Sequence, residues 1–357
     1  MGGNPYDYHA LQAVMGHAIH VFPYLYPPPS LLIFWPLYRM DYGTAKHLAL
    51  LLNHAVLLGL FWIMPRVVLP SSSSSANRFL AYALAIPYLL VSSPVQVTIT
   101  SGQINFLVLA SILLFWHLAR SQKHLTASFF LALSIVLKTY PVILILFLLV
   151  GSYKREAILT FLWLLVAVVV SVPFLPAHIW QDWISYVALK GGYASTPAGL
   201  FPPAVPWNQN LNGFFSRLFA DGSVAKIATY AAALLVVSVS AVSIRIGHEK
   251  DQGPGLDQIL LLSLPVMFLV APFSWDHHIV FVFPSLLLLF TSRHKIDGGG
   301  VMAFYLALGS IAVVLALRQT LPIKFYAVFF LWVLCVFGTL TSAAGQRPAP
   351  EPAARPA

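Results

Sequence analysis

The chain alternates between long apolar runs and short polar hinges. The apolar runs cover roughly residues 46–64, 78–95, 102–119, 156–175, 223–245, 257–272, 277–292, 300–317 and 321–341. A helix needs about 20 apolar residues to cross the hydrocarbon core of a bilayer. The pattern therefore predicts an all-α, polytopic integral membrane protein with about nine to eleven transmembrane or re-entrant helices.

One further apolar stretch is interrupted by polar residues. Residues 125–150 are apolar, but Lys138-Thr139-Tyr140-Pro141 lies near their middle. Basic residues flank both ends, so both ends are expected on the same side of the membrane. Either the run re-enters and returns, or two tilted half-length helices meet at the proline. Irregular backbone at membrane depth is tolerated only where it is buried in protein or lines a polar cavity, so the break points to a functional site.

Composition agrees with a membrane protein and excludes other classes. The 357 residues include only 20 Lys and Arg and 11 Asp and Glu, which is 9% of the chain. A soluble domain has about 25% charged residues, so a soluble enzyme is excluded. The single cysteine, Cys335, excludes a disulfide scaffold. A net charge of +9 is typical of nucleic-acid binding, but here we expect it to reflect topology, and no nucleic-acid partner is predicted.

The basic residues predict which hinges face the cytoplasm. Twelve of the 20 lie in every second hinge: Arg66 and Arg78, Arg120 and Lys123, Lys154 and Arg155, Arg245 and Lys250, Arg293 and Lys295, and Arg347 and Arg355. By the positive-inside rule these hinges are cytoplasmic. The two longest outer loops are then residues 1–45 and 176–222, and residues 346–357 form a flexible, Pro/Ala-rich cytoplasmic tail.

The first candidate site residues are polar residues that lie within apolar segments near the predicted outer face. A lysine at mid-membrane costs about 2.5–3.5 kcal/mol on insertion scales, so Lys138 is expected to meet a partner such as a lipid phosphate, unless it snorkels along its own stem. Gln103 and Asn105 lie where the 102–119 run begins. Their amides could bond neighbouring helices, or they could contact a phosphate or sugar at a helix N-terminus.

The outer loops are rich in aromatic and amide side chains. Trp207, Asn208 and Gln209 lie in the 176–222 loop and Arg217 follows them. Aromatic faces with amides suit a sugar-binding cleft, although a lid lying on lipid would look similar. Tyr26 precedes three prolines, a pattern typical of a helix start with aromatic residues at the membrane interface.

The most unusual hinge is Trp275-Asp276-His277-His278, a tight turn between two spans. Two histidines beside a carboxylate could act as general base, phosphate contact or metal ligands. Adjacent histidines on a helix point about 100° apart, and the sequence has no HExxH pattern or cysteine cluster. We therefore expect neither a metal nor another cofactor.

Six short segments occur in an order that resembles a known family. They are Asn4-Pro5-Tyr6-Asp7, Tyr26-Pro27-Pro28, Gly102-Gln103-Ile104-Asn105, Lys138-Thr139-Tyr140-Pro141, Asn208-Gln209-Asn210-Leu211 and Ser274-Trp275-Asp276-His277-His278. The sequence resembles glycosyltransferase family 87, which has the GT-C fold, from residue 4 to about 292. The resemblance implies a single GT-C-like transmembrane domain over residues 1–345.

The resemblance also implies a reaction. It is transfer of a hexose, with mannose expected, from a polyprenyl-phosphate sugar to a lipid-linked or cell-envelope glycan. The site would face the extracytoplasmic side of the plasma membrane, the inner membrane of a bacterium, and would contact membrane lipids. The implied catalytic residues are His278, His277 and Asp276. The implied contacts to the donor phosphate are Lys138, Gln103 and Arg217. The implied contacts to sugar or acceptor are Tyr26, Asn105, Trp207, Asn208, Gln209 and Trp275.

One departure from the family pattern concerns the catalytic base. Family members carry a helix and an aspartate-bearing outer loop upstream of the Asn-Pro-Tyr-Asp segment, and that aspartate is the expected base. The chain begins after that point, so we expect a fragment that lacks this base and that is inactive unless Asp276 or Asp7 substitutes for it. Asp7 matches the later motif and does not inherit the role. The main alternative is a lipid or sugar transporter or flippase, although no internal repeat is visible and the polar groups gather on one face. A membrane acyltransferase with His278 as base is a third hypothesis.

Overall fold

The computed structural model describes residues 4–15, 22, 24–69, 75–250, 255–291, 298–318 and 322–344. These residues form helices and connecting segments, with no strand among them, so the all-α prediction is confirmed. The predicted tail, 346–357, lies outside the described residues.

The helices follow the predicted apolar runs closely. In chain order they are α1 Tyr8–Met15, α2 Ser30–Tyr38, α3 Tyr42–Val68, α4 Ser75–Val91, α5 Ser93–Thr100, α6 Asn105–Arg120, α7 His124–Leu137, η1 Tyr140–Val142, α8 Ile143–Val150, α9 Lys154–Ser171, α10 Ala177–Asp182, η2 Trp183–Ala188, α11 Leu211–Leu218, α12 Gly222–Lys250, α13 Leu256–Val270, η3 Asp276–Phe281, α14 Phe283–Thr291, α15 Gly298–Ala316 and α16 Ile323–Ala344.

The lengths of these helices support a polytopic membrane protein. By length and composition, three of the described helices can cross a bilayer: α3, the Gly222–Gly247 part of α12 and the Ile323–Leu340 part of α16. The pair α4 and α5, bent by 44°, can count as a fourth span. Most of the other apolar runs form shorter helices of 10–17 residues, and α9 has 18 residues. Exposed apolar side chains such as Phe161, Val169 and Leu234 give the helices a surface suited to lipid.

The interrupted run enters and returns as two half-length helices. Helix α7 ends at Lys138, whose backbone is extended at φ −154° and ψ 128°. Pro141 has no N–H to continue a helical ladder, and a short 3₁₀ turn leads into α8. His124 Nδ1 lies 2.6 Å from Glu156 Oε1, which shows that both ends of the run lie at the same end of the molecule.

The opposite ends of the helices carry different chemistry. At one end, Arg120 forms an ion pair with Asp257 at 2.6 Å and donates a hydrogen bond to the carbonyl of Val67. At that end Tyr153 accepts a hydrogen bond from the backbone N–H of Leu256. Hinges that were predicted to be cytoplasmic therefore gather together, and the partition of the chain into two sides agrees with the structure.

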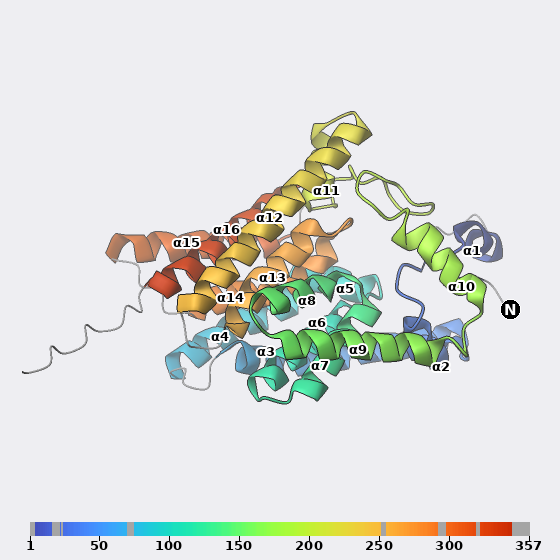
Figure 1. The fold of residues 1–357 in the computed structure, drawn as a ribbon, viewed down its shortest axis with the longest axis horizontal. Coiled ribbons are helices and arrows are strands. Elements are labelled where there is room, and N and C mark those ends of the chain that lie inside the picture. The colour runs from blue at the N-terminus through green and yellow to red at the C-terminus, as the bar shows by residue number, and fades with distance from the viewer. Residues whose placement is uncertain are drawn as a thin grey trace, which may run out of the picture.

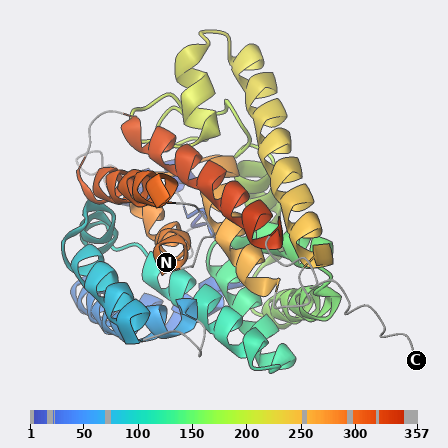
Figure 2. The ribbon, with the colours of Figure 1, turned by 90° about the vertical axis from the view of Figure 1, so that its left-hand side faces the viewer.

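The other end is built by the two long loops predicted to be outside. Figure 1 shows α1, α2 and α10 together at one side of the molecule, whereas α11 lies beside the upper end of α12. The 176–222 loop contains three short helices, α10, the π-helical η2 and α11. Asn4 Nδ2 donates to Asp182 Oδ2 at 2.5 Å, which ties the N-terminal segment to α10. In the perpendicular view the yellow helix α12 and the red helix α16 lie side by side over the blue to green helices (Figure 2).

Candidate functional site

A large cavity opens at the end that the two outer loops build. Its volume is about 1110 Å³, and most of its lining is apolar or aromatic. The walls come from the N-terminal segment, α5 and the α5–α6 turn, the break after α7, the 176–222 loop, the turn that leads into η3, and Arg318 after α15. Eight of the twelve predicted site residues line it: Tyr26, Gln103, Lys138, Trp207, Trp275, Asp276, His277 and His278.

Lys138 is the polar centre of this cavity. Its side chain is only 5% exposed, because the break after α7 directs it back into the protein. The Nζ atom lies 2.5 Å from Asn105 Oδ1, 2.8 Å from His278 Nε2 and 3.5 Å from Gln103 Oε1. The rings of Tyr26 and Tyr140 lie about 6 Å away, at 6.0 and 5.9 Å from their centroids. The Lys138 amine therefore contacts residues from segments that are far apart in the sequence.

Asn105 does not line the cavity, but it holds Lys138 and the His277 backbone in place. Its Nδ2 donates to the carbonyl of His277 at 2.9 Å, so its Oδ1 faces Lys138. Thr98 also accepts from Nδ2 at 3.3 Å, and the Asn105 side chain is fully buried. The Asn105 amide therefore bonds its neighbours within the protein, and its expected contact with sugar or acceptor stays a prediction.

The turn before η3 places the two histidines. Helix α13 ends at Ala271, where the backbone becomes extended, and Trp275 is extended as well. The backbone N–H of Trp275 donates to His278 Nδ1 at 3.0 Å, which fixes the ring and points Nε2 at Lys138. The edge of Tyr140 packs on His278 with 5.2 Å between ring centroids. His277 lies beside His278, with 4.2 Å between the rings.

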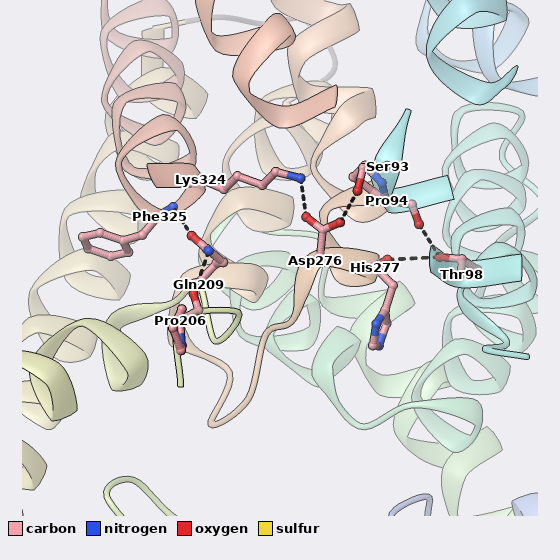
Figure 3. A network of polar contacts seen from close by, with 9 residues as sticks. All are labelled: Ser93, Pro94, Thr98, Pro206, Gln209, Asp276, His277, Lys324 and Phe325. Carbon is pink, nitrogen blue, oxygen red and sulfur yellow. Dashed lines mark hydrogen bonds and ion pairs between the residues drawn. The ribbon is translucent and has the colours of Figure 1, made fainter. Parts of the chain in front are cut away.

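Asp276 is held by two residues that sequence reasoning did not select. Lys324 Nζ forms an ion pair with Oδ1, and the Ser93 hydroxyl donates to Oδ2 at 2.7 Å. Figure 3 shows these two partners on opposite sides of the carboxylate, while the His277 ring points away from it. With both oxygens engaged, Asp276 is better placed to position the turn than to act as a free base. The sequence signal for Lys324 was a lysine at the outer start of the last apolar run.

Asn208, Gln209 and Arg217 do not line the cavity, and their expected contacts with ligand stay predictions. Asn208 Oδ1 accepts from the backbone N–H of Ser274 at 3.0 Å, and Gln209 Oε1 accepts from that of Phe325 at 3.0 Å (Figure 3). Arg217 Nη1 donates to the carbonyl of Asn208 at 2.9 Å. Amides buried in this way satisfy the backbone of irregular segments, so this part of the loop fixes the turn that carries the histidines.

Aromatic rings form the outer wall of the cavity. The ring of Phe201 packs edge-on against Trp207 at 5.3 Å and against Trp275 at 6.2 Å between centroids. Phe22 contacts both Phe201, at 5.7 Å, and Trp275, at 6.0 Å. Phe201 was not selected from the sequence, since a single phenylalanine in an aromatic loop carries no distinctive signal. The wall offers faces suited to sugar C–H groups or an isoprenoid chain.

Tyr26 supplies a neutral hydrogen-bond donor to the cavity. Its hydroxyl donates to Gln103 Oε1 at 3.2 Å, and Tyr6 donates to the Tyr26 carbonyl at 2.9 Å. Burial raises the pKa of Tyr26 to about 12, so the phenol keeps its proton at physiological pH. Gln103 Oε1 is therefore directed at two donors, Tyr26 and Lys138.

The described residues do not bring three His, Cys, Asp or Glu side chains together in a way that could hold a metal ion. The polar end of the cavity instead presents an amine, an imidazole, an amide and a phenol. These groups can hydrogen-bond an anion and stabilise charge that develops on it.

Comparison with known proteins gives one family match. The sequence model of glycosyltransferase family 87 matches residues 24–272, well over half of the chain. A relative from Mycobacterium tuberculosis (strain ATCC 25618 / H37Rv) is described as a polyprenol-phosphate-mannose-dependent alpha-(1-2)-phosphatidylinositol mannoside mannosyltransferase. It is 23% identical over 276 residues, which are 75% of this chain and 62% of the relative. The chain thus matches less than two thirds of that protein's length. No solved structure matches.

Proposed function

The chain belongs to glycosyltransferase family 87, and from that membership we propose that it transfers a hexose from a polyprenyl-phosphate sugar to a glycolipid or cell-envelope glycan. The observation that carries the proposal is the cavity in which Lys138, Gln103 and His278 meet beside an aromatic wall. We expect the sugar to be mannose, because the mycobacterial relative is described as dependent on polyprenol-phosphate-mannose.

The polar end of the cavity suits the donor phosphate. Among the described residues no carboxylate pairs with Lys138, whereas the other buried lysine near the site, Lys324, has Asp276. An anionic ligand would therefore find an amine that is not already paired with a protein acid. Glycosyl transfer breaks the bond between the anomeric carbon and the phosphate oxygen, and negative charge develops on the departing lipid phosphate. Pre-oriented donors at this point lower the barrier.

The remaining residues of the site have separate proposed roles. His278 and Gln103 assist Lys138 at the phosphate, while His277 and Trp275 line the path to the sugar. Trp207 and Tyr26 offer a stacking face and a hydroxyl to sugar or acceptor. Asp276 holds the turn in place through Lys324 and Ser93. We place the reaction on the extracytoplasmic face of a bacterial plasma membrane, because the cavity lies at the end opposite the basic hinges.

The test is transfer by the purified chain in lipid nanodiscs, with polyprenyl-phosphate mannose and extracted envelope glycolipids as substrates. Lys138→Met should reduce transfer by about 100-fold or more, the scale seen when one pre-oriented donor is removed. Lys190→Met is the control, since Lys190 is exposed and does not line the cavity. Wild-type protein that binds no polyprenyl-phosphate sugar would contradict the proposal. Movement of the labelled donor across the vesicle membrane, without transfer of its sugar to an acceptor, would instead favour a transporter.

A further inference from the structure

The hydrogen bonds around Lys138 determine which atoms carry protons. The backbone N–H of Trp275 can only donate, so His278 Nδ1, 3.0 Å away, must accept with its lone pair. A neutral imidazole with an unprotonated Nδ1 carries its proton on Nε2. That Nε2–H points at Lys138 Nζ, 2.8 Å away. The amine must then accept this hydrogen bond, which an ammonium group cannot do.

The other two contacts of Lys138 complete the count. Asn105 Oδ1, at 2.5 Å, is an acceptor because the Nδ2 of the same amide donates to the His277 carbonyl. Gln103 Oε1, at 3.5 Å, also accepts a hydrogen bond from Tyr26. A neutral amine has two N–H donors and one lone pair. The two acceptors, Asn105 Oδ1 and Gln103 Oε1, and the one donor, His278 Nε2–H, therefore satisfy all the hydrogen-bonding groups of a neutral amine.

The protonated alternative leaves a conflict. An ammonium group has three donors and no acceptor, so His278 Nε2 would have to carry the lone pair. Its proton would then lie on Nδ1 and face the N–H of Trp275, two donors 3.0 Å apart. A cation would also be buried at 5% exposure without a counter-ion among the described residues, which is costly.

We propose that Lys138 is a neutral amine in the empty site and that binding of the donor phosphate is coupled to uptake of one proton by this lysine. The inference rests on the proposed function, because it takes the ligand to be a phosphodiester anion. The proton comes from solvent, the amine becomes an ammonium ion, and its charge balances the single negative charge of the phosphodiester. The Lys138–His278 bond opens in the same step, and Nζ and Nε2–H then both donate to phosphate oxygens.

The groups that face Lys138 make it the site of uptake. Tyr26 faces it from the segment before α2, Tyr140 from η1, and His277 and His278 from η3. From the α5–α6 turn and α6 it meets only the uncharged Gln103 and Asn105. The phenol of Tyr26 already carries its proton, and that of Tyr140 donates to the Phe273 carbonyl at 2.9 Å. Nδ1 of His278 is occupied by Trp275, so a proton added there would lose that bond.

The test is isothermal titration of the wild-type protein in nanodiscs with polyprenyl-phosphate mannose, whose phosphodiester does not titrate near neutral pH. Parallel titrations in two buffers of different ionisation enthalpy give the number of protons taken up. Wild type should take up about one proton per donor, and its affinity should fall by up to about tenfold per unit of rising pH. Lys138→Arg keeps a permanent charge and should bind with no uptake and a flat pH dependence.

Two further variants sharpen the measurement. Lys190→Arg changes an exposed lysine near Tyr186 and should take up protons as wild type does. Lys138→Met is a second variant at the site itself, expected to bind more weakly and without uptake, so a failure of Lys138→Arg to fold would not end the test. Wild-type binding without proton uptake would overturn this inference and leave the proposed function standing. Uptake that persists in both Lys138 variants would overturn it as well. No binding of the donor at all would remove the proposed function, and the inference with it.

Discussion

Two buried lysines near the cavity, Lys138 and Lys324, have different partners, and this difference indicates different roles for them. Lys324 is fully buried and forms an ion pair with Asp276, so its charge is balanced within the protein. Lys138 is almost as buried, but it meets two amide oxygens and an imidazole. A balanced pair stabilises the turn that carries the histidines, whereas an unbalanced amine can respond to an incoming anion. Sequence alone could identify Lys138, because it interrupts an apolar run, but not Lys324, because a lysine at the edge of a run is common.

The pairing of Lys324 predicts a defined pattern of stability changes. Lys324→Met leaves the Asp276 carboxylate without its ion-pair partner and should destabilise the protein by about 3 kcal/mol, the scale for breaking a buried pair. Adding Asp276→Asn removes the second charge and should restore more than half of the loss, since no unpaired charge remains. Denaturant unfolding in nanodiscs measures both. A single variant as stable as wild type, or a double variant no better than the single, would contradict the pairing.

At the scale of elements, the sequence predicted what depends on local pattern and missed what depends on distant contacts. Every predicted apolar run corresponds to a helix or a bent pair, and the break at Lys138 is present. The pattern could not show whether the amide of Asn105 faces ligand or protein. Its partner, the carbonyl of His277, lies 172 residues away in the chain. The same holds for Gln209, which reaches Phe325 across 116 residues.

Helix α11 offers a prediction about the loop that supports the histidine turn. Gly213 lies in the first turn of α11, where an added Cβ would meet the backbone carbonyl of Asn208. Gly213→Ala should therefore displace the 206–210 segment and destabilise the protein by about 2 kcal/mol, as overpacking does, with weaker donor binding. Gly222→Ala is the matched control, because nothing lies within 4 Å of an added Cβ there. Equal melting temperatures for the two variants would show that the contact is not needed.

The whole molecule has two chemically different ends, one with the basic hinges and one with the cavity. Arg120, Asp257 and the carbonyl of Val67 meet at the first, and the cavity with Lys138 and the histidine turn lies at the other. Charge counting along the sequence could predict this partition, because cations accumulate in alternate hinges. The shape of the cavity could not be predicted, since its walls come from segments as far apart as Pro5 and Arg318 that only the folded chain brings together.

Orientation in the membrane is the remaining prediction at this scale, and the chain is well suited to testing it. Cys335 is the only cysteine and is fully buried, so the wild-type protein is the unlabelled control for a membrane-impermeant maleimide. Ala198→Cys, in the exposed part of the 176–222 loop at the cavity end, should react in intact cells. Ser121→Cys, exposed between α6 and α7 at the basic end, should react only after the membrane is permeabilised, because the positive-inside rule places that hinge in the cytoplasm. The reverse pattern would put the cavity on the cytoplasmic face, and the donor would then have to be supplied from that leaflet.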